Sequence, residues 1–125
     1  MADTPAGSTI WLIDDNEALR FTLGLHLTEC GFSVVEMAGS VEALDRLDAG
    51  EVPQLIVTDL ELAQGQPNGL ALARMAKLRL RHLPVIFLIG SVDLDQEDIG
   101  DLGKVVLKPV DLDVLVNLIR WMIDH

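Results

Sequence analysis

The chain has 125 residues, and 20 Asp and Glu against 9 Lys and Arg give it a formal net charge of −11. This length suits one domain with one hydrophobic core, and the 50% share of hydrophobic residues excludes a disordered chain. The acidic balance argues against direct nucleic-acid binding, because phosphate contacts need clustered basic residues. No apolar run approaches the length of a membrane span, so we expect no membrane partner.

The first eight residues form a polar segment that lacks the basic and apolar regions of a signal peptide. We interpret residues 1–8 as a flexible leader and residues 9–125 as one folded domain. Cys30 is the single cysteine of the sequence, which excludes an internal disulfide. With no export signal, the expected location is the cytoplasm.

Five short apolar runs, each bounded by turn residues, predict buried strands. These runs cover residues 9–13, 33–37, 55–58, 84–89 and 105–107. Helices are predicted between and after them, because capping residues stand at the starts of the intervening segments. The predicted helices cover about 16–30, 41–48, 69–81 and 112–123, with Asp15 or Asn16, Ser40, Asn68 or Gly69, and Asp111 at their starts. The acidic segment 91–103 predicts only a short, weak helix.

Alternating strands and helices predict a parallel sheet that is covered by helices on both faces. The right-handed crossover rule permits the doubly wound strand order 2-1-3-4-5. This order brings the carboxyl ends of the first, third and fifth strands to one edge of the sheet. Ligand sites form at that edge, where the strand order reverses.

Charged residues end these three strands. Asp14 and Asp15 follow the first, Asp59 follows the third, and Lys108 follows the fifth, just before Pro109. Three clustered carboxylates repel one another, and a hard divalent cation such as Mg²⁺ relieves that repulsion. A lysine opposite the acids suits a phosphoryl group, and an Asp carboxylate can be the nucleophile that forms an aspartyl phosphate. Asp59, on the central strand of the three, is best placed for that role.

Taken together, these residues resemble the receiver domain of a two-component response regulator over nearly the whole chain. Further residues that carry the resemblance are Leu19-Arg20, Gly31-Phe32 and Pro84-Val85. The resemblance implies a flavodoxin-like fold and a signalling domain that is not an enzyme. It implies that Asp59 accepts phosphate from a histidine kinase or a histidine phosphotransfer protein, and that a downstream partner or fused output domain receives the signal. The implied Mg²⁺ ligands are Asp14, Asp15, Asp59 and the backbone carbonyl of Glu61, with Lys108 pairing the phosphate.

Two positions depart from the pattern of that family. Ile89 stands where the family usually places Thr or Ser, and Gly90 and Ser91 follow it. Ser91 lies about 6.6 Å further along a strand, so its hydroxyl substitutes only if the chain bends back at Gly90. Val105 stands at the position of the switch aromatic. The usual coupling between hydroxyl and aromatic is therefore not expected here.

Three other interpretations compete with a phosphoacceptor. Ile89 and Val105 favour an interaction module that no longer depends on phosphate, whereas the intact acids and Lys108 oppose it. A haloacid-dehalogenase-like phosphatase would need an Asp-x-Asp-x-Thr motif after the third strand, and Glu61-Leu62-Ala63 stands there instead. An electron-transfer flavodoxin is disfavoured, because the acidic sheet edge would repel a flavin phosphate.

The last predicted helix carries two apolar stripes. One makes an adequate core face; the second consists of Val114, Leu118 and Trp121. An exposed aromatic and aliphatic stripe often marks an interface. We therefore expect these three residues to contact another chain, in a homodimer or a partner complex.

Overall fold

The computed structural model describes residues 8–62, 67–90 and 99–124. In these parts of the chain, five parallel strands form one sheet in the order β2-β1-β3-β4-β5, which confirms the predicted topology. The strands are β1 (Thr9–Ile13), β2 (Ser33–Met37), β3 (Leu55–Asp59), β4 (Val85–Ile89) and β5 (Lys104–Leu107). Asp59 is itself the last residue of β3, in register with Leu88 of β4.

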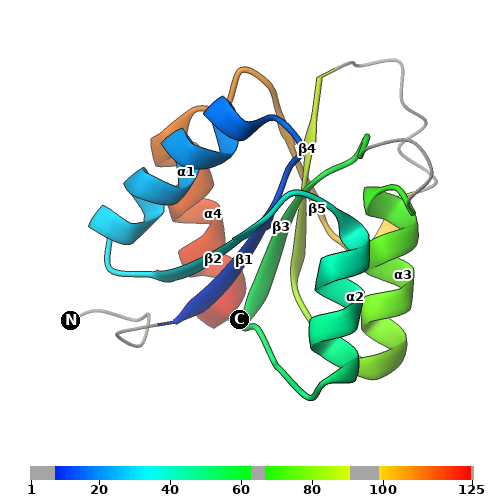
Figure 1. The fold of residues 1–125 in the computed structure, drawn as a ribbon. Helices are drawn as coiled ribbons and strands as arrows, with labels where there is room; N and C mark the ends of the chain where they lie inside the picture. The colour runs from blue at the N-terminus through cyan, green and yellow to red at the C-terminus, as the bar shows by residue number, and fades with distance from the viewer. Residues whose placement is uncertain (1–7, 63–66, 91–98, 125) are drawn as a thin grey trace.

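Helices cover both faces of this sheet. They are α1 (Glu17–Glu29), α2 (Ser40–Asp48), α3 (Gly69–Arg79) and α4 (Leu112–Asp124), with a short 3-10 turn, η2, at Gly100–Leu102. Helices α1 and α4 lie on one face and α2 and α3 on the other (Figure 1). The weak helix predicted over 91–103 is represented by η2 alone in its described part, and residues 91–98 lie outside the described residues. Among the described residues, no helix has the length and apolar character that crossing a membrane requires.

The helix starts follow the predicted capping chemistry with one exception. The side chains of Asn16, Asn68 and Asp111 accept hydrogen bonds from backbone N–H groups in the first turns of α1, α3 and α4. The predicted cap at Ser40 is wrong, because Gly39 precedes α2 and Ser40 is already helical. Ser40 is fully buried, and its hydroxyl donates to the Pro67 carbonyl at 2.7 Å instead of capping its own helix.

The apolar residues form one cluster on each face of the sheet. Successive strand residues point to opposite faces, so Trp11 and Ile13 join the cluster under α2 and α3, whereas Leu12 joins the one under α1 and α4. Both clusters are shielded from water, which explains why every residue of β3 and β4 is buried. This packing fixes the carboxyl ends of the strands relative to one another.

Candidate functional site

Three carboxylates meet at the carboxyl edge of the sheet. Asp14 follows β1, and its N–H donates to the Met37 carbonyl of β2 at 3.1 Å, which extends the sheet by one residue. Asp14, Asp15 and Asp59 each place one carboxylate oxygen within 4.8 Å of the others. The structure thus brings together the acids that the sequence places at the ends of two separate strands.

Asp14 is fully buried, although it is charged. Its Oδ1 accepts a hydrogen bond from the N–H of Asn16 at 2.8 Å, and its carbonyl accepts one from the guanidinium of Arg20 at 2.6 Å. Its Oδ2 accepts no hydrogen bond from any described residue. A buried oxygen without a hydrogen bond is costly, so this atom favours the approach of a cation.

Asp59 ends β3, the central strand of the sheet, and is 8% exposed. Its Oδ1 accepts a long hydrogen bond of 3.4 Å from the N–H of Glu61. Burial is the largest effect that raises the pKa of Asp59, and the charge of Asp14 adds to it, whereas Lys108 opposes both. The negative charge of Asp59 is therefore poorly compensated by the protein itself.

Lys108 is the cation that faces these acids. Its Nζ lies 3.5 Å from Oδ2 of Asp14 and 3.4 Å from Oδ1 of Asp59, so the ammonium bridges the two buried carboxylates. The N–H of Lys108 donates to the Ile89 carbonyl at 2.8 Å, which anchors the lysine to the end of β4. One ammonium against three carboxylates leaves the site negative, and its all-oxygen donor set fits Mg²⁺.

Comparison with known proteins identifies this arrangement. Residues 10–120 match the response regulator receiver domain family. The chain belongs to that family. It is 31% identical over 121 residues to the DNA-binding transcriptional regulator NtrC of Klebsiella pneumoniae, a match that covers 92% of this chain and 24% of NtrC. It is 25% identical over 118 residues to the CAI-1 autoinducer sensor kinase/phosphatase CqsS of Vibrio cholerae, covering 90% of this chain and 17% of CqsS. The chain thus spans a quarter or less of these curated relatives.

Solved receiver structures share the same fold. A response regulator receiver protein from Sinorhizobium medicae superposes with a TM-score of 0.88 at 25% identity, covering 95% of this chain and 96% of that one. A receiver protein from Pseudomonas putida gives a TM-score of 0.80 at 32% identity, covering 94% of this chain and 99% of that one. The five-stranded sheet is therefore a receiver fold of the two-component phosphorelay class, and in this class an acidic cluster binds Mg²⁺.

The predicted switch positions, Ile89 and Val105, carry apolar side chains that pack against the core. Ile89 is 3% exposed and belongs, with Phe87, to the cluster under α2 and α3. Val105 is half-buried, packs against the same cluster and lies in register with Phe87. Gly90 is exposed, and Ser91 lies outside the described residues. The fully buried Phe87 ring, which the sequence analysis did not single out, is the aromatic group beside Val105.

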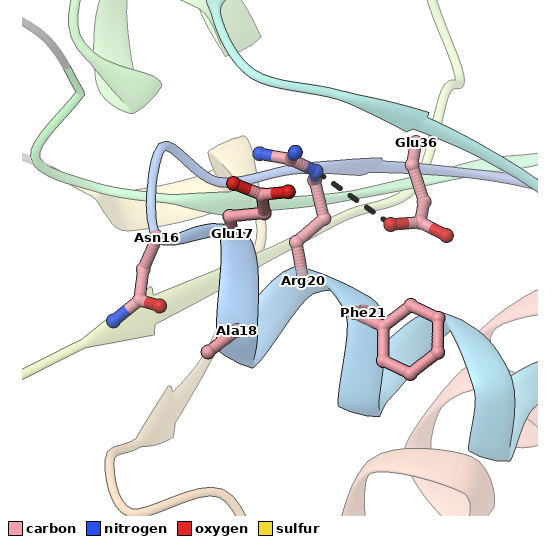
Figure 2. Close-up of a pocket in the computed structure, with 6 residues that line it drawn as sticks. All are labelled: Asn16, Glu17, Ala18, Arg20, Phe21 and Glu36. Carbon is pink, nitrogen blue, oxygen red and sulfur yellow. Dashed lines mark ion pairs between the residues drawn. The ribbon is translucent and has the colours of Figure 1, made fainter.

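Arg20 is a site residue whose role the sequence analysis missed. Besides its bond to the Asp14 carbonyl, it forms an ion pair of 3.6 Å with Glu36 of β2 (Figure 2). An open hollow of about 630 Å³ lies beside this pair, between the first turns of α1 and the end of β2. The dipeptide Leu19-Arg20 contributed to the family resemblance, but no sequence pattern shows that Arg20 reaches back to a carbonyl six residues earlier.

The predicted α4 interface is only partly exposed. Val114 is 52% and Trp121 51% exposed, whereas Leu118 is half-buried and packs against the cluster under α1 and α4. The roles assigned to these residues, to Glu61 and to the three acids stay predictions. The geometry adds that Asp15 is exposed while Asp14 and Asp59 are buried.

Proposed function

We propose that this receiver takes a phosphoryl group on Asp59 from a histidine kinase or a histidine phosphotransfer protein. The observation that carries the proposal is a buried Asp59 carboxylate 3.4 Å from Lys108, beside Asp14, at the end of the central strand. In the proposed step, an oxygen of Asp59 attacks phosphorus, and a new P–O bond forms as the P–N bond to the donor imidazole breaks. The imidazole nitrogen leaves with the bonding electrons, and a proton taken up by the ring gives neutral histidine.

Lys108, Asp59 and Asp14 contribute to the proposed phosphoryl transfer in different ways. Lys108 sits within ion-pair distance of Asp59 and neutralises charge that the incoming phosphoryl oxygens bring to a buried site. Burial on both faces of the sheet fixes the direction of the Asp59 carboxylate, which favours in-line attack. Asp14 is held by Asn16 and Arg20, so its second oxygen stays directed into the site.

We further propose that Mg²⁺ occupies this acidic cluster. The donor set fits, because Asp14 offers a buried oxygen with no hydrogen bond from the described residues, and Asp15 and Asp59 offer oxygens within 4.8 Å. The backbone carbonyl of Glu61, two residues after Asp59, is the proposed additional ligand. When bound, the ion supplies positive charge that offsets the phosphoryl oxygens during transfer.

Intact mass spectrometry tests the assignment. After incubation with Mg²⁺ and acetyl phosphate, the protein should gain one phosphoryl mass, and Asp59→Asn should gain none. A matched control is Asp101→Asn, because Asp101 is an exposed acid in η2, away from the acidic cluster. Equal labelling of Asp59→Asn and the parent would refute the assignment.

A second candidate function is an interaction module that acts without phosphate, and it is favoured by the apolar packing of Ile89 and Val105. The two functions differ in the behaviour of Asp59→Asn toward a signalling partner. A phosphoacceptor loses phosphate-dependent partner binding in this variant, whereas a phosphate-independent module binds its partner as the parent does.

The proposed output is a change in protein–protein contacts with a downstream partner or a fused domain. NtrC is a DNA-binding regulator and CqsS a sensor kinase, so sequences similar to this chain occur as parts of larger proteins of different kinds. The α4 surface formed by Val114, Leu118 and Trp121 is our proposed contact with another chain, in a homodimer or a partner complex. Its exposed ends at Val114 and Trp121 support that proposal.

A further inference from the structure

Helix α1 carries an exposed stripe that the acidic site does not use. Phe21 is 62% and Leu25 51% exposed, and the two lie one helical turn apart. Glu17 precedes Phe21 by four residues and Glu29 follows Leu25 by four, and both glutamates are exposed. Figure 2 shows the Phe21 ring projecting from the helix. We call these four residues the acidic stripe: two apolar side chains with a carboxylate at each end.

The end of α3 and the turn after it carry the opposite pattern. Leu78 is 85% exposed, the highest exposure among the large hydrophobic residues that the structure describes. Arg74 lies four residues before it and Arg81 three residues after it, and both are exposed. We call Arg74, Leu78 and Arg81 the basic stripe. Residues 74–82 hold four of the nine Lys and Arg of the chain and no acid, although the chain as a whole is strongly acidic.

The basic stripe has charge available for a partner. Nearby cations are already engaged: Arg79 pairs with Asp48 at 2.6 Å, and Lys77 donates to the Leu83 carbonyl at 2.9 Å. By contrast, Arg74 and Arg81 make no ion pair or hydrogen bond through their side chains with any part of the chain that the structure describes. These two guanidinium groups are therefore free to pair with carboxylates of another molecule.

An apolar hollow lies beside the basic stripe. It has a volume of about 310 Å³, and its walls include the turn before β3 and the turn between α3 and β4. Its apolar lining consists of Val52, Pro53, Leu80, Leu83 and Pro84, and Arg81 stands at its border. The exposed Val52 side chain, at 65%, adds apolar surface next to it. An aromatic ring such as that of Phe21 suits this hollow in size and polarity.

The two stripes lie on opposite faces of the sheet, because α1 covers one face and α3 the other (Figure 1). A single chain therefore cannot bring them together. We propose that the acidic stripe of one copy docks on the basic stripe and apolar hollow of a second copy, in a head-to-tail contact. Charge complementarity selects this occupant, since the chain itself supplies a carboxylate–apolar–carboxylate stripe for an arginine–apolar–arginine stripe. Such a contact is heterologous, so an open assembly keeps one unused acidic stripe at one end and one unused basic stripe at the other.

Sedimentation velocity over a wide range of protein concentration tests the contact. The parent should sediment faster as its concentration rises. Raising the salt from about 0.1 M to about 1 M shortens the Debye length from about 10 Å to about 3 Å, and this should weaken the association. A small interface of this kind is expected to be weak, so the concentration series has to extend to the millimolar range.

Two variants separate the halves of the interface. Phe21→Glu with Leu25→Glu replaces the apolar centre of the acidic stripe by negative charges. Leu78→Glu with Arg81→Glu replaces the apolar residue and one of the two positive charges of the basic stripe by negative charges. All four positions are exposed, so circular dichroism and melting temperature should match those of the parent. Each variant alone should sediment as a monomer at every concentration. An equimolar mixture of the two should form a one-to-one dimer and nothing larger, because it contains one intact pair of stripes.

The outcomes that overturn the proposal are specific. A parent that stays monomeric through the series shows that the stripes do not join two copies, and an acidic, apolar helix of a different protein is then the occupant to seek. Two variants that associate as the parent does, or a mixture that fails to pair, exclude the head-to-tail contact. Val114→Glu distinguishes this contact from a homodimer through α4: loss of association in this variant alone would overturn the head-to-tail contact and place self-association on α4 instead.

Discussion

Replacing Asp59 by Asn is expected to stabilise the metal-free domain, because the carboxylate is buried among charges that do not compensate it. At an effective dielectric constant of about 20, the 3.4 Å contact with Lys108 contributes roughly −5 kcal/mol, and a carboxylate oxygen within 4.8 Å costs at least roughly 3.5 kcal/mol. The buried Asp14 exerts most of this repulsion, whereas the exposed Asp15 is screened by water. The attraction to Lys108 and the repulsion from Asp14 therefore largely offset each other. The free-energy cost of removing the Asp59 charge from water is left without compensation.

An uncompensated buried polar group typically costs about 1–3 kcal/mol. Burying a charged group costs more than burying a neutral one, so Asp59→Asn, which replaces the carboxylate by a neutral amide, removes the part of the cost that is due to the charge. Lys108 keeps its ion pair with Asp14 at 3.5 Å. We therefore expect the free energy of unfolding to rise by about 1–3 kcal/mol. For a domain of this size, that raises the melting temperature by about 3–5 °C for each kcal/mol.

The pH dependence of the free energy of unfolding provides an independent check that Asp59→Asn is stabilising. Burial raises the pKa of Asp59, with Asp14 adding to the effect and Lys108 opposing it. The folded protein therefore holds this proton to higher pH than the unfolded chain does, and the parent loses stability as pH rises through the folded pKa. The advantage of Asp59→Asn should be absent below the unfolded pKa of about 3.9 and complete above the folded pKa.

Thermal and urea unfolding in EDTA, followed by circular dichroism across this pH range, measures the effect. Asp101→Asn is the matched control and should change nothing, because Asp101 is exposed in η2. Mg²⁺ at about 100 times its Kd should stabilise the parent by about 2.7 kcal/mol, and it should stabilise Asp59→Asn less. An Asp59→Asn variant that is no more stable than the parent, or an advantage that does not vary with pH, would refute the reasoning.

Three further predictions concern the metal, the switch and the α4 surface. Mg²⁺ should change the fluorescence of the buried Trp11 in a Trp121→Phe background, and Asp14→Ala should remove the response; a response that survives would exclude this metal site. Ile89→Thr adds a hydroxyl at the end of β4, so it should change the lifetime of the phosphorylated state measured by mass spectrometry, and an unchanged lifetime would show that the position has no influence. Val114→Glu with Trp121→Glu should weaken phosphate-dependent partner binding measured by calorimetry while leaving the fold intact, and unaltered affinity would move the interface elsewhere.

The sheet and its charged edge could be predicted from the sequence because they depend on local patterns. Apolar runs of strand length, alternating with capped helices, define a parallel sheet, and three of the five runs end abruptly in Asp14, Asp59 or Lys108. The carboxyl ends of parallel strands share one edge, so convergence of these residues follows from topology alone. The contact distances to Lys108 confirm that convergence.

Contacts between distant segments could not be predicted in this way. Serine is a common helix-capping residue, which is why the sequence predicts a cap at Ser40. In the folded chain the buried Ser40 hydroxyl donates instead to the Pro67 carbonyl, an acceptor that only tertiary packing brings close. Arg20 lies on α1 at a position that helical periodicity leaves unassigned, and only the fold brings it to the Asp14 carbonyl and to Glu36. The partial burial of Leu118 likewise depends on how α4 is rotated against α1, which the periodicity of one helix does not specify.

The most direct test of the central claim is to locate the phosphoryl group after transfer from a phosphorylated histidine kinase. Borohydride reduces an acyl phosphate to an alcohol, so an aspartyl phosphate becomes homoserine at the modified position. Peptide mass spectrometry of the treated protein should find homoserine at position 59, and Asp59→Asn should yield no homoserine at any position. Homoserine at position 14 or 15, or phosphate that the kinase transfers equally well to Asp59→Asn, would contradict the account.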